Sequence, residues 1–152
     1  MLCLLDTEFQ PEPPTSFHVK IFDGAAIVHS LPTSNAPTFG EYGDNVFLPW
    51  TKHQLQNCDR IDIVWDTYKA DSIKEATREK RGKGLRRKVE EKTKMPGNFA
   101  DFLRDPTNKE ELFGLLTIKV TSCDYGSGKD VYITSGKYQM SYNSQLYVEC
   151  AF

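Results

Sequence analysis

The sequence of 152 residues lacks the features of several large protein classes. No eighteen apolar residues follow one another without a charge, and no basic stretch of the kind that opens a secretory signal precedes the first apolar residues. The cysteines are scattered, without the close Cys or His pairs of a zinc site, at Cys3, Cys58, Cys123 and Cys150. These absences predict an intracellular protein with reduced thiols, in the nucleus or the cytoplasm, and no insertion into a membrane.

Positive charge is scarce in the first 66 residues, which contain three Lys or Arg against nine Asp or Glu. Residues 78–94 reverse this balance, with nine Lys or Arg against three Glu. A segment of that density can neutralise several phosphates, and its two glycines let the backbone follow a curved polyanion. The alternative interpretation is a solvated helix end followed by a mobile loop, or a basic address signal.

The first sixteen residues contain three prolines and no periodic pattern, so we expect a loosely ordered leader at 1–16 and one domain at 17–152. Short runs of β-branched, aromatic and other apolar residues then predict strands. These runs lie at 17–22, 60–65 and 131–134, and an alternating pair at 137–142 and 145–149 is typical of a hairpin that turns at Asn143 and Ser144.

Helix signals separate these strands. Thr38 and Glu41 form a possible capping box before an apolar-periodic stretch that reaches Leu55, and Pro49 should kink or split that helix. A second capping box opens a helix at 72–81. Further helices are predicted at 98–104 and at 107–121, the latter opened by Thr107.

Strand, helix, strand, helices, strand is the order of an α/β fold with a mostly parallel sheet and helices on both faces. Sites in such sheets lie at the carboxyl ends of the strands. Asp23 follows the first predicted strand and Asp66 follows the second, so we expect both carboxylates at one edge of the sheet.

Two carboxylates at neighbouring strand ends can hold a hard divalent cation, Mg²⁺ or Mn²⁺, which could activate water against a phosphodiester. The basic residues beyond Asp66 would then hold the nucleic-acid backbone. The alternative interpretation is that Asp23 and Asp66 cap helices or turns and bind nothing. Asp124 and Glu149 are further acids, but neither follows a strand in the expected way.

Several motifs resemble the flap-endonuclease-like branch of the PIN-like superfamily. They begin with Phe-Asp-Gly-Ala-Ala at 22–26 and Val-Trp-Asp-Thr-Tyr at 64–68, followed by Thr-Arg-Glu-Lys-Arg-Gly at 77–82. Asn-Lys-Glu-Glu-Leu-Phe at 108–113 and Val-Tyr-Ile-Thr-Ser-Gly at 131–136 come next in the same order. The chain is similar, over about residues 17–136, to metazoan PIN-like proteins of uncharacterised activity that are often present in many copies.

This resemblance implies a Rossmann-like, three-layer PIN-type domain derived from metal-dependent nucleases that act on DNA or RNA. It implies that Asp23 and Asp66 are the metal-binding carboxylates of the first half of the site, with Mg²⁺ or Mn²⁺ as the cofactor, and that Lys74, Arg78 and Arg81 contact phosphate. Together with the rest of the basic run, the expected nucleic-acid-binding residues are Lys74, Arg78, Lys80, Arg81, Lys83, Arg86, Arg87 and Lys88.

The chain departs from the family after the third predicted strand. Members continue into a helix that begins with a Cys-His-Glu-Glu-Ala-Asp-like sequence and supplies the remaining acids, whereas this chain reads Val-Glu-Cys-Ala-Phe at 148–152. We therefore expect a truncated domain with a half-built site, incomplete or inactive as a nuclease, and an exposed sheet edge. The alternative function is a noncatalytic module that binds nucleic acid or an acidic protein surface through the basic segment 78–94.

Overall fold

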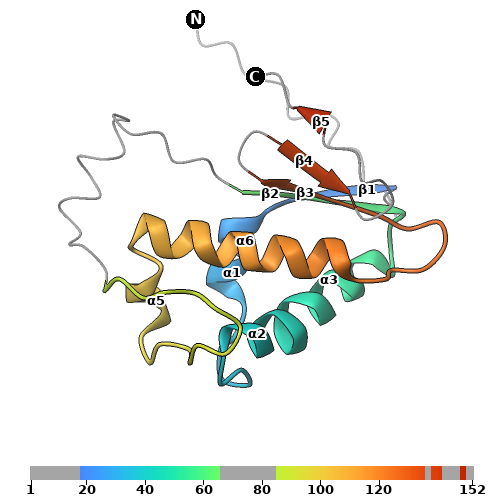
Figure 1. Ribbon diagram of the computed structural model, residues 1–152. Coiled ribbons are helices and arrows are strands. Elements are labelled where there is room, and N and C mark those ends of the chain that lie inside the picture. The colour runs from blue at the N-terminus through green and yellow to red at the C-terminus, as the bar shows by residue number, and fades with distance from the viewer. Residues whose placement is uncertain (1–17, 66–84, 136–137, 142–147, 150–152) are drawn as a thin grey trace, which may run out of the picture.

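The computed structural model describes residues 18–65, 85–135, 138–141 and 148–149 (Figure 1). The predicted leader at 1–16, the predicted helix at 72–81 and the predicted turn at Asn143 and Ser144 lie outside these ranges.

A sheet of five strands forms one side of the described structure. Strands β1 (Val19–Asp23), β2 (Arg60–Val64) and β3 (Asp130–Ser135) are parallel and adjacent, and β4 (Tyr138–Ser141) and β5 (Val148–Glu149) follow in antiparallel order. This order confirms the three predicted strands and the parallel sheet, and it places β1 at one edge of the described sheet.

All the described helices lie on one face of the sheet, so the described residues form two layers and not the three that we predicted (Figure 1). The strand order explains this arrangement. Both crossovers, from β1 to β2 and from β2 to β3, step in the same direction along the sheet. Because crossovers between parallel strands are right-handed, two steps in one direction bring their helices to the same face. The described structure is thus a mixed α/β fold with a Rossmann-like layout of its parallel strands.

The first crossover contains helix α1 (Gly24–Ser30), helix α2 (Phe39–Tyr42), a π-helical turn η1 (Gly43–Phe47) and helix α3 (Leu48–Leu55). The predicted capping box is present: the Thr38 hydroxyl accepts from the Glu41 amide, and the Glu41 carboxylate accepts from the Thr38 amide. The predicted split also occurs, and η1 is the junction. Pro49 lies in the first turn of α3, where its missing N–H costs least.

The second crossover ends in the short helix α5 (Phe99–Phe102) and the long helix α6 (Pro106–Ser122). The prediction that Thr107 opens α6 is wrong. Asp105 is the N-cap, because its side chain accepts from the Asn108 amide and Pro106 fits the first helical position.

The core lies between the sheet and these helices. Ile61 and Ile63 of β2 and Leu112, Leu116 and Val120 of α6 are fully or almost fully buried. Aromatic side chains also pack there, since Tyr42, Phe47 and Trp65 are buried and Trp50 packs against the core.

The opposite face of the sheet is open within the described residues. Alternate residues of β1 and β2 point to it, and Ile21 is 71% exposed, Val19 46% and Val64 42%. On the same face the Arg60 guanidinium forms a fork with Asp62 and stacks on the Tyr132 ring at 4.1 Å. Among the described helices, none is long and apolar enough to cross a membrane.

Candidate functional site

We call the ends of the three parallel strands the carboxyl edge; it contains Asp23, Val64 and Ser135. Asp23 is the last residue of β1 and pairs in register with Val64. Its side chain is also the N-cap of α1, because Oδ1 accepts from the Ala26 amide at 3.1 Å. Asp23 is exposed, so the carboxylate faces solvent at the predicted edge while it caps the helix that follows.

Trp65 links the predicted motifs at this edge. Its amide donates to the Thr134 hydroxyl at 2.7 Å, and its indole Nε1 donates to the Thr117 hydroxyl at 3.0 Å. The indole lies almost parallel to the Phe113 ring, with the ring centroids 4.1 Å apart. Strand β3, helix α6 and the end of β2 are therefore joined at one side chain.

Gly24 is the counterpart of Trp65. A methyl group at Gly24 would overlap the six-membered part of the indole ring, so only glycine fits there. The residue after Asp23 thus touches the residue before Asp66. This contact explains the glycine at position 24, and it brings the Asp-Gly and Trp-Asp motifs together through Gly24 and Trp65.

Asp66 itself lies outside the described residues, as do Lys74, Arg78, Lys80, Arg81 and Lys83. Of the two further acids, Asp124 is exposed, accepts from the Gly126 amide and precedes β3, so it lies toward the amino ends of the strands. Glu149 lies in β5, opposite Tyr138. His29, on α1, is exposed.

A divalent cation at the carboxyl edge needs oxygen ligands. Within the described ranges, no three His, Cys, Asp or Glu side chains are grouped closely enough to hold a metal ion. Asp23 supplies an exposed carboxylate, one oxygen of which accepts from a backbone amide. Mg²⁺ is commonly held by one or two carboxylates together with water and substrate phosphate, so this donor fits such an ion as part of a small ligand set.

The second region with predicted site residues is an extended segment, residues 85–95, which we call the strap. Its downstream half lies on the first turn of α2. The Phe39 amide donates to the Thr93 carbonyl at 3.0 Å, and the Gly40 amide donates to the Glu91 carbonyl at 2.9 Å. These amides have no partner within a helix, so the strap satisfies donors that α2 leaves open. A side chain at Gly40 would press on the Glu91 backbone, which explains glycine at this position.

The upstream half of the strap is fixed to α6 by Asn108, which is fully buried. Its amide nitrogen donates to the carbonyls of Leu85 and Phe102 at 2.9 and 3.0 Å. Its amide oxygen accepts from the Arg87 amide and from the Arg86 guanidinium, both at 2.9 Å. Both donors and both lone pairs of this buried amide are therefore satisfied.

Glu111, one turn further along α6, holds the same part of the strap. Oε2 accepts from the Val89 amide at 2.9 Å, and Oε1 pairs with the Arg86 guanidinium. The Val89 amide and the Arg86 guanidinium hold the pKa of Glu111 below its ordinary value, against the opposing effect of burial. We call Asn108 and Glu111, with Arg86 between them, the clamp.

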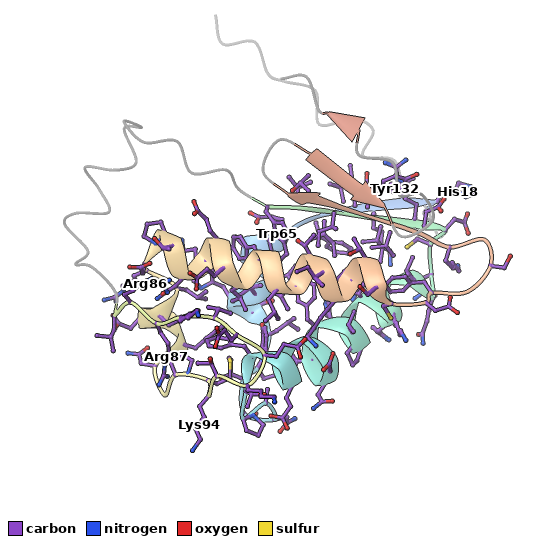
Figure 2. The ribbon with its side chains drawn as sticks, in the orientation of Figure 1. His18, Trp65, Arg86, Arg87, Lys94 and Tyr132 are labelled. Atoms are coloured by element: carbon purple, nitrogen blue, oxygen red, sulfur yellow. The ribbon has the colours of Figure 1, made fainter. Side chains whose placement is uncertain are left out.

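The strap has five Lys or Arg and two Glu residues, and they are not equivalent. Arg86 belongs to the clamp, and Lys88 pairs with Glu90 at 2.6 Å. Glu91 lies 3.3 Å from Lys119, which also pairs with Asp44 of η1. No described side chain forms an ion pair with Arg87, Lys92 or Lys94. Lys92 and Lys94 are exposed, and the Lys94 side chain points away from the body of the domain (Figure 2).

The clamp and the carboxyl edge lie on the same side of the molecule. Helix α6 runs back toward the amino end of β3, so its first turns lie near the carboxyl ends of the strands (Figure 1). Phe113, which stacks on Trp65, follows Glu111 by two residues. The beginning of the strap and the Asp23 carboxylate are thus parts of one side of the domain.

Asn108 and Glu111 were not predicted as functional residues. Their only sequence signal was the Asn-Lys-Glu-Glu-Leu-Phe motif at 108–113, which carried the resemblance without a role for each residue. Arg86 was predicted to contact nucleic acid, and the structure places its guanidinium in the clamp.

Comparisons with protein-family models, with curated proteins and with solved structures found no match. The resemblance to PIN-like proteins therefore depends on the sequence motifs alone, and the function that it implies stays a prediction.

Proposed function

We propose that this chain is a PIN-like domain, derived from a metal-dependent nuclease, that binds DNA or RNA on the side formed by the carboxyl edge and the strap. Within residues 1–152, the two acids that match the expected metal ligands are Asp23 and Asp66. The two regions have complementary chemistry for this role. The edge offers carboxylates to a cation, and the strap offers cations to phosphates.

The observation that carries this proposal is the contact between Gly24 and Trp65. Two sequence motifs about forty residues apart meet there, each beside the acid that the family uses for metal. Asp66 is the residue after Trp65 in the chain, and the proposal assigns its carboxylate to the same cation as Asp23.

Asp23 and Asp66 would hold Mg²⁺ or Mn²⁺ between the ends of β1 and β2. When bound, such an ion supplies positive charge that offsets the negative charge of a phosphodiester. The chain's own contribution is to orient Asp23. The hydrogen bond from the Ala26 amide holds Oδ1, and the residue is exposed.

A second candidate function is a noncatalytic module in which the basic segment 78–94 binds nucleic acid or an acidic protein surface and the acids are structural. The N-cap role of Asp23 favours it, because capping alone explains an aspartate at this position. The two candidates differ in their dependence on metal at Asp23.

Affinity for labelled single-stranded DNA and RNA oligonucleotides, measured from low to physiological salt, tests the nucleic-acid binding of the first candidate and of the nucleic-acid form of the second. Binding should weaken steeply with salt, because each phosphate that is bound releases a counterion. Charge reversal at Arg78 and Arg81 should flatten that dependence by about one unit of slope for each phosphate that is no longer bound. An affinity that does not change with salt contradicts phosphate binding.

A further inference from the structure

We propose that Asn108, Glu111 and Arg86 are positioning residues for the nucleic-acid-binding strap. They hold the backbone of residues 85–89 on α6, so that Arg87 and the cations further along the strap are presented in a fixed arrangement. This inference depends on the proposed nucleic-acid binding and assigns Arg86 a role other than phosphate contact.

The geometry separates Arg86 from the other cations of the strap. Its guanidinium bonds to the Asn108 amide oxygen and to the Glu111 carboxylate. The same two side chains accept from the Arg87 and Val89 amides. One arginine and two backbone amides are therefore bound by three oxygen atoms of two side chains. Displacing the arginine would loosen the backbone on either side of Arg87.

The far end of the strap is held independently. Thr93 and Glu91 bond to the first turn of α2, and the Met95 amide donates to the Pro37 carbonyl at 2.9 Å. Fixed at both ends, the strap keeps its exposed cations at set positions. A preorganised cation array loses less conformational entropy when it binds a polyanion than a flexible one does.

The positioning role and simple electrostatics predict opposite changes in nucleic-acid affinity for Glu111→Gln. Glu111→Gln removes a negative charge beside a polyanion site, so a purely electrostatic effect would strengthen binding. If the clamp positions the strap, the same change weakens binding, because a glutamine side chain is a poorer partner for the guanidinium and offers only one acceptor oxygen.

Glu110→Gln is the matched control. Glu110 is the preceding residue of α6, is exposed and has the same charge. No described residue forms an ion pair with it. Its substitution reports the electrostatic effect of losing one carboxylate on this part of α6 with the clamp intact.

The experiment measures the affinity of wild type, Glu111→Gln and Glu110→Gln for a labelled single-stranded oligothymidylate at low salt, after thermal unfolding shows that each variant folds. Amide hydrogen exchange of Arg87 and Val89, without nucleic acid, reports the clamp directly. A second variant, Arg86→Lys, keeps the charge but loses the planar fork and is available if Glu111→Gln does not fold.

We expect Glu110→Gln to bind at least as tightly as wild type, and Glu111→Gln and Arg86→Lys to bind about three- to tenfold more weakly, with faster exchange at Arg87 and Val89. Binding by Glu111→Gln equal to or tighter than that of Glu110→Gln, or full affinity in Arg86→Lys, overturns the positioning role while nucleic-acid binding stands. A wild-type chain that does not bind overturns the proposed function, and the positioning role with it.

Discussion

The strap and the carboxyl edge both contain charged residues that the sequence assigns to a site, but they use charge differently. In the strap, Arg86 and Lys88 are paired with carboxylates within the domain. At the carboxyl edge, the described residues provide one partner for Asp23, a backbone amide, and Trp65, which follows β2, makes the structural contacts. The comparison teaches that the density of charge in a sequence overstates the charge that is available to a partner.

We expect the largest loss of stability from removing Asn108, the buried residue of the clamp. Asn108→Ala removes the donor to the carbonyls of Leu85 and Phe102 and the acceptor of the Arg87 amide, so we expect the free energy of unfolding to fall by about 2–4 kcal/mol. Urea unfolding measures this loss.

Asn98→Ala is the control for that change. Asn98 is exposed and caps the short helix α5, so its removal should cost about 1 kcal/mol. Equal losses of stability in the two variants would contradict the claim that the buried hydrogen bonds of Asn108 stabilise the domain more than a helix cap does.

The next effect concerns the carboxyl edge. Gly24→Ala forces a methyl group against the Trp65 ring, and we expect a destabilisation of about 1–3 kcal/mol. Gly114→Ala is its matched control, because nothing lies within 4 Å of a methyl group there. Alanine is the better helix former, so this variant should be more stable by up to about 1 kcal/mol. Denaturant unfolding of both variants measures whether each change lowers or raises the free energy of unfolding. A Gly24→Ala variant as stable as wild type would contradict the close contact with Trp65.

The smallest effect is a dependence on pH. The pKa of Glu111 is lowered in the folded state, so its contribution to stability is fully present above the ordinary value of 4.5 and is lost as pH falls through the lower folded value. Thermal unfolding between neutral and acidic pH should therefore show a shallower loss in Glu111→Gln than in wild type. Parallel curves would mean that the clamp does not depend on the charge of Glu111.

Much of the fold could be predicted from local patterns. The runs around Ile21, Ile63 and Ile133 are strands, and the Thr38 capping box has the expected hydrogen bonds. The layering could not be predicted in this way, because it depends on the order of strands in the sheet, and that order is set by contacts between distant residues. Local signals also misplaced the start of α6, where Asp105 and Pro106 are the stronger capping pair.

The sequence predicted the candidate site only where a charged residue lies at the end of a recognisable strand. Asp23 lies at the carboxyl edge as expected, because the end of a strand is visible in the sequence. The clamp was not predictable. A polar residue on a helix is typical of a solvated face, and only the structure shows that Asn108 is buried against a segment some twenty residues earlier in the chain.

The central claim is a cation site at Asp23, and the most direct test is thermal unfolding with and without millimolar Mn²⁺ for wild type, Asp23→Asn and Asp105→Asn. Both aspartates cap helices, and asparagine caps equally well, so the two variants differ mainly in the loss of the proposed ligand. At a tenfold excess over the dissociation constant, bound metal adds about 1.4 kcal/mol to stability, or about 3–6 °C in Tm. We predict this rise in wild type and Asp105→Asn and its absence in Asp23→Asn. The same response to Mn²⁺ in all three proteins would contradict a cation site at Asp23.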